Sequence, residues 1–228
     1  MLFRKAILII HGFGGGTYDE EYLANKLETI RNYDVYTFTL PGHDGIKLNM
    51  KEEKWVKKTE EMLEFLINNK YKTIYVIGHS MGGVLAARLA TKYKEIKKLV
   101  LLAAAFRYLE FKEDEIDVVK SLTKVPTLAK EYKDEFISRL QKMPIQSIKE
   151  FMNTVKDNEE TLKYINIPTL IIQGTDDNLV PPETAEFIYN EIKSQEKEIL
   201  KEDGVNHDIF RSNKKASITN EIIRFLKK

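Results

Sequence analysis

Short apolar runs alternate with longer amphipathic segments along most of the chain. This alternation is typical of a parallel sheet whose two faces are covered by helices. The apolar runs predict strands at Ala6–Ile10, Tyr33–Phe38, Thr73–Ile77, Leu99–Ala103, Thr169–Gln173 and Glu198–Lys201. The amphipathic segments predict helices at Glu20–Ile30, Glu53–Asn68, Gly82–Tyr93, Pro182–Lys193 and Ala216–Leu226. The pattern therefore predicts an α/β fold with a mostly parallel sheet of about six strands.

One interval, from Phe106 to Asn158, breaks this alternation. It contains no run with the character of a strand, but it carries two ladders of apolar residues at helical spacing. The ladders are Leu128, Tyr132, Phe136 and Leu140, and then Ile145, Ile148, Phe151, Met152 and Val155. A structureless loop of this length would be unusual inside a compact domain. We therefore predict a helical cap, residues 106–158, that lies over the sheet edge and is inserted into a single domain of residues 1–228.

The third predicted strand runs directly into Gly78-His79-Ser80-Met81-Gly82-Gly83, and an Ala- and Leu-rich helix follows. This is a Gly-x-Ser-x-Gly motif in the strand–turn–helix context that gives it meaning. A side chain at Gly78 or Gly82 would collide with a neighbouring strand or helix, so this sharp turn requires glycine there. The turn is expected to hold the hydroxyl of Ser80 above the sheet as a nucleophile. The alternative is a glycine-rich turn in which Ser80 only caps the helix.

A serine hydroxyl needs a base to take its proton, and the base needs a carboxylate to orient it. Of the four histidines, only His207 follows the serine in the chain, just after the last predicted strand. His79 is the immediate neighbour of the serine, and its side chain should leave the turn in a different direction. The carboxylate should lie between serine and histidine in chain order, where the loop after the fifth strand offers Asp176 and Asp177. The position of Asp177 relative to Val180-Pro181 favours Asp177 over Asp176.

Each of these residues alone has a simpler interpretation. Asp177 could be a turn aspartate bonded to its own backbone, and His207 could be a histidine of a surface loop. Together, however, Ser80, Asp177 and His207 follow three strands at their carboxyl ends, where parallel α/β folds place their sites. We therefore predict that these three residues form a catalytic triad.

A tetrahedral intermediate needs two N–H donors that are already aimed at its negative oxygen. The backbone N–H of Met81, the residue after the nucleophile, is the first predicted donor. The loop after the first strand, His11-Gly12-Phe13-Gly14-Gly15-Gly16, is glycine-rich enough for its backbone to approach a substrate closely. The N–H of Phe13 is the predicted second donor. A phosphate-binding loop is disfavoured, because neither Gly-x-x-x-x-Gly-Lys-Ser/Thr nor Gly-x-Gly-x-x-Gly occurs here.

Together these motifs resemble the α/β-hydrolase superfamily, and within it the small bacterial carboxylesterases and monoacylglycerol lipases. The resemblance spans nearly the whole chain in the family's order and rests on His11–Gly15, Leu40–His43, Gly78–Gly83, Gly174–Pro181 and Gly204–His207. It implies an α/β-hydrolase fold and the cleavage of carboxylic esters, with no metal and no organic cofactor. The first predicted strand starts almost at Met1, so the extra N-terminal strands of larger members are expected to be missing.

The resemblance also implies that Ser80, Asp177 and His207 occupy the family's triad positions, with Phe13 and Met81 at its oxyanion positions. Because the base must be neutral to accept a proton, activity should rise with pH through about 6 to 7. His43 either lines the site or only punctuates its loop, and we leave it outside the predicted site.

The apolar ladders of the cap favour short- to medium-chain acyl esters or monoacylglycerols as substrates, although packing of the cap onto the domain explains the first ladder equally well. Thioesterases, lactonases, acyltransferases and carbon–carbon bond hydrolases use the same triad, and a non-catalytic ligand receptor could share the fold. Haloalkane dehalogenases and soluble epoxide hydrolases are disfavoured, because their nucleophile is an aspartate and here it is Ser80.

Composition narrows the classes further. The 36 Lys and Arg nearly balance the 35 Asp and Glu, so no long-range field gathers nucleic acid, and we expect a small-molecule ester as the partner instead. The absence of cysteine excludes disulfides and thiolate sites and fits a reducing compartment. No apolar stretch approaches the ~18 residues of a membrane span, and Ala6–Ile10 is short for a secretory signal. We therefore expect a cytoplasmic protein.

Overall fold

The computed structural model describes residues 4–43, 51–107 and 144–228, and a six-stranded sheet runs through the middle of this part of the chain. The strand order is β2-β1-β3-β4-β5-β6, and every pairing between neighbours is parallel. The strands are β1 Lys5–Ile10, β2 Tyr33–Thr37, β3 Ile74–His79, β4 Ile96–Leu102, β5 Thr169–Gly174 and β6 Lys197–Glu202. All six predicted strands are therefore present, and the predicted parallel sheet is confirmed.

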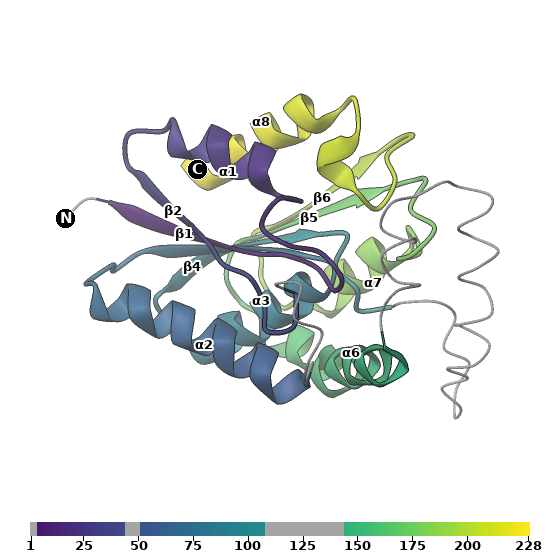
Figure 1. Cartoon of the computed structure of the whole chain (residues 1–228). Helices are drawn as coiled ribbons and strands as arrows, with labels where there is room; N and C mark the ends of the chain where they lie inside the picture. The colour runs from purple at the N-terminus through teal and green to yellow at the C-terminus, as the bar shows by residue number, and fades with distance from the viewer. Residues whose placement is uncertain (1–3, 44–50, 108–143) are drawn as a thin grey trace.

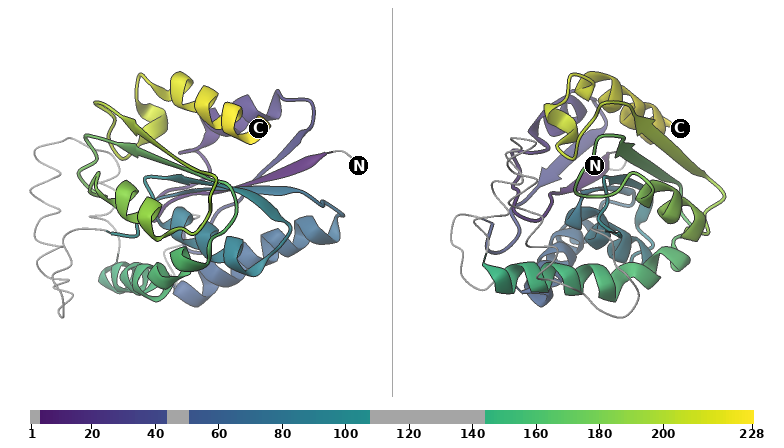
Figure 2. Two further views of the ribbon diagram at one scale, coloured as in Figure 1. Left: turned by 180° about the vertical axis from the view of Figure 1, so that it is seen from behind. Right: turned by 90° about the vertical axis from the view of Figure 1, so that its right-hand side faces the viewer.

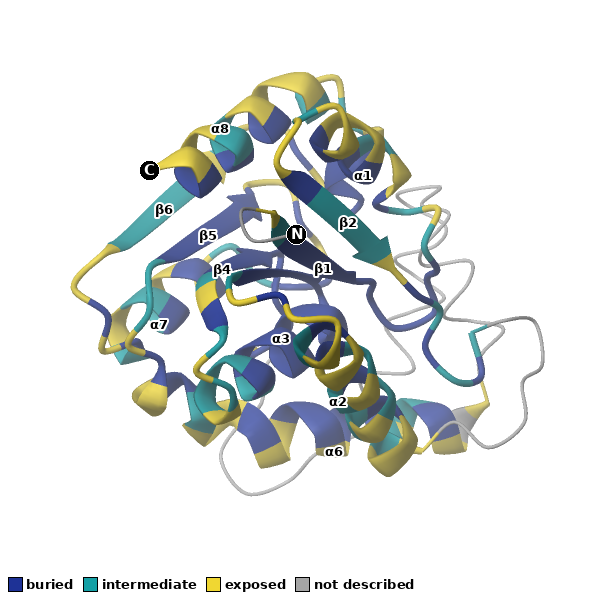
Figure 3. Ribbon diagram, turned by 90° about the vertical axis from the view of Figure 1, so that its left-hand side faces the viewer, coloured by how far each residue is buried: buried dark blue, intermediate teal, exposed yellow. Residues whose placement is uncertain are grey.

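Burial explains why the strands differ so much in their amino-acid composition. β1, β3 and β5 are buried along nearly their whole length and consist mainly of Ile, Leu, Val and small residues. β2 and β6 form the two edges of the sheet, are only partly buried and carry polar residues. Figure 3 shows this gradient, with β1, β4 and β5 mostly buried and β2 and β6 intermediate. A parallel sheet covered on both faces requires such continuous apolar runs in its central strands.

Two layers of helices enclose the sheet (Figures 1 and 2). On one face lie α1 Glu21–Glu28 and α8 Lys215–Lys227, and on the other lie α2 Glu52–Asn68, α3 Met81–Lys92, α6 Ile145–Asn158 and α7 Thr184–Glu191. Short 3-10 turns, η1 Glu159–Tyr164 and η2 Ile209–Arg211, precede β5 and α8. All five helices predicted outside the insertion are present. Within the described ranges, no helix is long and apolar enough to cross a bilayer.

Helix α6 contains the second apolar ladder of the predicted cap. Phe151, Met152 and Val155 are buried, and the helix packs against α3 and α2 in the same layer (Figure 2). Residues 108–143, which include the ladder from Leu128 to Leu140, lie outside the described residues. The end of the predicted insertion is therefore helical, and the cap as a whole remains a prediction.

The carboxyl ends of the strands are level with one another, at the end of the sheet to which all the strands point. Ile10 at the end of β1 pairs with Gly78 of β3, and His79 pairs with Leu102 of β4. Gly174 at the end of β5 pairs with Glu202 of β6. The loops that leave these strands therefore start side by side, although they are far apart in the sequence.

Two adjacent residues of α2 provide a test of which side of this helix faces the core. Leu66 is fully buried, whereas Phe65 is 50% exposed. We expect Leu66→Ala to lower the free energy of unfolding by about 2–5 kcal/mol, because it leaves a cavity in the core. The matched Phe65→Ala change should cost less than about 1 kcal/mol. Urea unfolding followed by circular dichroism measures both, and equal losses would contradict the packing of α2.

Candidate active site

Ser80 lies between the last residue of β3 and the first residue of α3, in a strained backbone conformation. Its φ is 53° and its ψ is −120°, in a region that side-chain-bearing residues rarely adopt. Such strain costs about 1–3 kcal/mol and persists only where the surroundings enforce it. Here the N–H of Ser80 donates to the carbonyl of Leu102 at 2.9 Å, and the carbonyl of Ser80 accepts from Gly83 at 2.9 Å and Ala105 at 3.2 Å. The turn is thus held from both β4 and α3.

The two glycines of the motif are required for the steric reason that the sequence predicts. A Cβ atom on Gly82 would lie 2.1 Å from the carbonyl oxygen of Ile10, at the end of β1. A Cβ atom on Gly78 would lie 2.2 Å from the carbonyl oxygen of Gly82, in the first turn of α3. Neither contact can be relieved by a rotamer change, because both partners are backbone atoms. The predicted collisions at Gly78 and Gly82 are confirmed.

Asp177 and His207 meet in the interior, at the same carboxyl end of the sheet as Ser80. The Nδ1 atom of His207 donates to Oδ2 of Asp177 at 2.9 Å, and both side chains are buried. This bond places the proton of a neutral imidazole on Nδ1 and leaves the lone pair on Nε2, as a base for a serine hydroxyl requires.

The carboxylate of Asp177 is held by three further donors. The backbone N–H groups of Leu179 and Val180 both donate to Oδ1 at 2.9 Å, and Nε2 of Gln173 donates to Oδ2 at 2.8 Å. Asp176, the other predicted candidate, is exposed and accepts from Thr175 at the surface. The structure therefore brings Asp177, and not Asp176, to His207. Gln173 was not predicted; its signal is a polar residue near the end of an otherwise apolar strand.

The glycine-rich loop after β1 packs directly against the serine. A Cβ atom on Gly12 would lie 2.9 Å from Cβ of Ser80 and 3.6 Å from its Oγ. The carbonyl of Gly12 accepts from Nδ1 of His11 at 2.8 Å and from the N–H of Gly15 at 3.2 Å. Because a peptide unit is planar and trans, fixing this carbonyl also fixes the opposite direction of the N–H of Phe13.

Met81, the first predicted oxyanion donor, is the first residue of a helix. Met81 begins α3, so its N–H has no acceptor within the helix and lies at the positive end of the helix dipole. Both predicted donors, at Phe13 and at Met81, therefore belong to segments next to Ser80.

His11 holds the loop after β1 in place through its two ring nitrogens. Besides donating to Gly12, it accepts the N–H of Leu40 at its Nε2 atom, at 2.9 Å. Burial lowers the pKa of His11 to about 4, and the charge of His43 acts in the same direction, so the ring is neutral at pH 7. The sequence did not indicate this role, because it depends on a contact between residues 29 positions apart.

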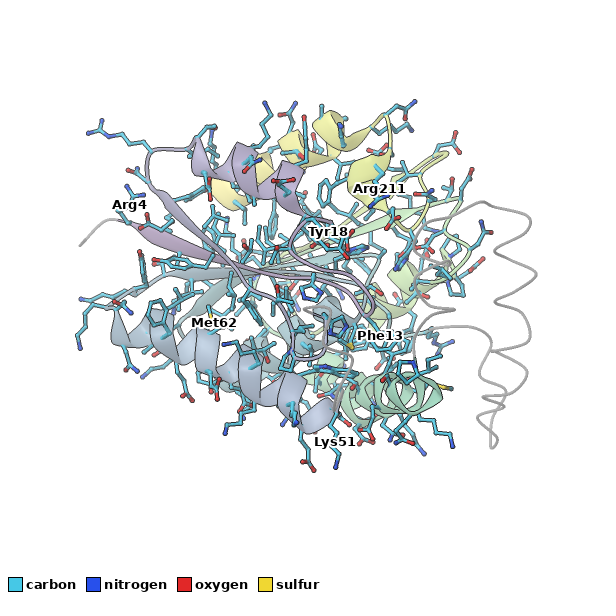
Figure 4. The ribbon with its side chains drawn as sticks, in the orientation of Figure 1. Arg4, Phe13, Tyr18, Lys51, Met62 and Arg211 are labelled. Carbon is cyan, nitrogen blue, oxygen red and sulfur yellow. The ribbon has the colours of Figure 1, made fainter. Side chains whose placement is uncertain are left out.

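Aromatic rings surround Phe13, whose side chain points toward the layer of α3 and α6 (Figure 4). The ring of Phe13 stacks on that of Phe151 from α6, with centroids 5.1 Å apart. Trp55 from α2 and His43 each approach Phe13 edge-on at 5.7 Å. His43, which was left outside the predicted site, thus packs on the loop that carries the predicted Phe13 donor.

The parallel sheet, the strained serine after β3 and the buried histidine–aspartate pair define an α/β-hydrolase, as the resemblance implied. A family model described as serine aminopeptidase, S33, matches residues 3–214, and the chain belongs to this family.

Two relatives and one solved structure align with most of this chain. A carboxylesterase of Bacillus subtilis (strain 168) is 25% identical over 98% of this chain and 93% of the relative. A thermostable monoacylglycerol lipase of Bacillus sp. (strain H-257) is 28% identical over 86% of this chain and 79% of the relative. A solved structure from work on two metagenome-derived lipolytic enzymes, LipS and LipT, has a TM-score of 0.79 at 24% identity, covering 98% of this chain and 94% of that one. The last comparison establishes the shared fold.

The buried neutral ring of His11 predicts a specific acid sensitivity. Its pKa is about 4 in the folded protein and about 6.5 in the unfolded chain, so the unfolded state binds more protons between these values. The contribution of neutral His11 to the free energy of unfolding should be fully present above pH 6.5, and up to about 3 kcal/mol of it should be lost as the pH drops to 4. We expect His11→Asn to be less stable at pH 7 but to lose less stability on acidification. Urea unfolding at each pH measures the free energy of unfolding of both proteins. If that free energy depended on pH equally in the two, this account would be contradicted.

Proposed function

We propose that this protein is a serine hydrolase that cleaves carboxylic esters through an acyl-enzyme on Ser80. The observation that carries the proposal is the buried 2.9 Å bond between His207 and Asp177, at the carboxyl end of the sheet where Ser80 is held in its strained turn. The names of the relatives, carboxylesterase and monoacylglycerol lipase, support an ester as the substrate.

In the proposed reaction, Nε2 of His207 takes the proton of Ser80 as Oγ attacks the acyl carbon. The N–H groups of Phe13 and Met81 hold the negative oxygen of the tetrahedral intermediate, and one such donor is worth roughly 10²–10³ in rate. The bond between the acyl carbon and the alcohol oxygen then breaks, and His207 returns its proton to the leaving alcohol. Water hydrolyses the acyl-enzyme by the same steps, and Asp177 stabilises the imidazolium each time. This chemistry needs neither a metal nor an organic cofactor.

For the acyl group, we propose short- to medium-length chains, including those of monoacylglycerols. The support is local: Phe13, Phe151 and Trp55 place apolar rings next to the peptide that donates to the oxyanion. These rings are buried, so an acyl chain that packed against them would itself leave water, and each buried methylene group is worth about 0.8 kcal/mol. We also propose a cytoplasmic location, which the absence of cysteine fits and which cell fractionation would test.

Two adjacent aspartates test the triad with a matched pair of variants. Asp177→Asn removes the negative charge beside His207 and favours the wrong tautomer, so kcat should fall by at least about a thousandfold. Asp176→Asn alters an exposed carboxylate of the same loop and should leave kcat within about twofold. The measurement is the hydrolysis of p-nitrophenyl butyrate, with alanine p-nitroanilide as a peptidase control. Equal losses in the two variants, or a preference for the anilide, would contradict the proposal.

Phe151 tests whether α6 limits the length of the acyl chain. Phe151→Ala removes the ring that stacks on Phe13, so the preferred chain among p-nitrophenyl esters of two to twelve carbons should become longer by about two to four carbons. Val155→Ala, which shrinks another buried side chain of the same helix, should leave the preference unchanged. An identical chain-length profile in both variants would mean that Phe151 only packs α6 onto the domain.

A further inference from the structure

His79, the last residue of β3, has a buried side chain that takes no part in the reaction proposed for Ser80. Its Nδ1 atom lies 2.7 Å from Oε1 of Glu20, just before α1. Its Nε2 atom lies 3.0 Å from the backbone carbonyl oxygen of His207. The imidazole rings of His79 and His207 are 5.0 Å apart and tilted by 35°. One buried side chain thus joins the start of α1, the turn of the serine and the loop of the proposed base.

The partners of the two ring nitrogens determine where the protons lie. A carbonyl oxygen only accepts hydrogen bonds, so Nε2 of His79 must carry a hydrogen and donate it to His207. The short contact between Nδ1 and the carboxyl group of Glu20 requires a second hydrogen. Burial lowers the pKa of His79, but the hydrogen bond and the charge of Glu20, with those of Asp208 and Asp19, outweigh it and raise the pKa to about 9. Burial also raises the pKa of Glu20, and its hydrogen bond to His79 and the charge of His79 oppose that rise. The short bond and the mutual attraction favour the ion pair, in which His79 is an imidazolium that donates from both nitrogens at neutral pH.

The charges around this pair come from several elements. Asp19 lies next to Glu20, and Asp208 follows His207; both carboxylates favour the positive charge on His79. Arg211 of η2 lies 3.9 Å from a carboxylate oxygen of each of these aspartates, near Tyr18 in Figure 4. The neutral ring of His11 also interacts with His79, and the ring of His207 lies 5.0 Å from that of His79. The carboxylates of Glu20, Asp19 and Asp208 act on His79, and Arg211 is a positive charge beside the two aspartates. These surroundings favour the protonated ring.

We propose that Glu20 and His79 are positioning residues for the catalysis described above: the Nε2–H of His79 holds the carbonyl of His207, and thereby sets where the imidazole of His207 stands relative to Ser80. The inference rests on the proposed function of Ser80 and His207. Its physical basis is the short path between them, because His79 is covalently joined to the nucleophile and hydrogen-bonded to the backbone of the base. A displacement of about 1 Å between reacting groups can cost about a hundredfold in rate.

Loss of the proton from His79 would break this connection. The pair would keep one hydrogen for two contacts, and attraction to the carboxylate of Glu20 favours its place on Nδ1. The lone pair on Nε2 would then face the carbonyl oxygen of His207, and the two would repel each other. Because the protonated form is the one that holds His207, activity should decline as the pH rises through about 9.

The variant Glu20→Gln separates the hydrogen bond from the charge. A glutamine amide can donate to Nδ1 of a neutral His79, whose Nε2–H still bonds to His207. At position 79, His79→Gln offers an amide N–H near the place of Nε2, whereas His79→Met fills a similar volume without a donor. These three variants distinguish a positioning role from simple packing.

The experiment is a proton NMR titration of the four histidine Cε1–H signals combined with pH profiles of kcat and KM. We expect His79 to titrate near pH 9 in the wild-type protein and to stay neutral from pH 7 to 10 in Glu20→Gln, which should also lack the alkaline decline in kcat. His79→Met should lose roughly ten- to a hundredfold in kcat with KM within about threefold. His79→Gln should recover most of that loss.

A wild-type His79 that titrates below pH 7 would overturn the proposal, as would equal losses of kcat in His79→Met and His79→Gln. If His79→Met does not fold, the comparison of wild type with Glu20→Gln decides the question alone. The NMR titration requires no catalysis, so absent esterase activity would count against the proposed function without altering the result for the Glu20–His79 pair.

Discussion

The close approach of α3 to the ends of β1 and β3 is the constraint on which the rest of the site depends. Gly82 lies against the carbonyl of Ile10, and no side chain fits between them. Because the helix starts so close to the sheet, the chain must turn within one residue, and Ser80 takes the positive φ that this turn demands. The same approach brings the loop of Gly12 and Phe13 against the serine. The nucleophile and both proposed oxyanion donors therefore follow from a single backbone contact.

The other loops of the site are fixed by buried polar groups, each of which connects two segments that are distant in the sequence. Asp177 accepts from its own turn and from His207, while His11 connects the loop after β1 to Leu40. His79 connects Glu20 to the backbone of His207. Buried polar atoms are costly unless paired, so each connection also selects one arrangement of the loops. The rigidity that proposed catalysis requires thus comes from the same groups that hold the loops together.

Most of the fold could be predicted from the sequence, because its signals are local. Strands such as β1 and β5 are uninterrupted apolar runs, and the glycines around Ser80 reflect a collision between backbone atoms that any such turn produces. Chain order and the small number of histidines led to His207 and Asp177, which the structure places together. Contacts such as that between Glu20 and His79, 59 residues apart, carry no local pattern and were not predicted. The predicted cap depends on residues 108–143, which lie outside the described part, so only its last helix has a known place.

The central claim is that Ser80 forms a covalent acyl-enzyme with an ester substrate. The most direct measurement is mass spectrometry of the intact protein during hydrolysis of p-nitrophenyl butyrate, followed by digestion to locate the modified residue. The account predicts a transient butyryl adduct on the peptide that contains Ser80, together with release of p-nitrophenol, and neither in Ser80→Ala. Undiminished hydrolysis by Ser80→Ala, or an adduct on another residue, would contradict it.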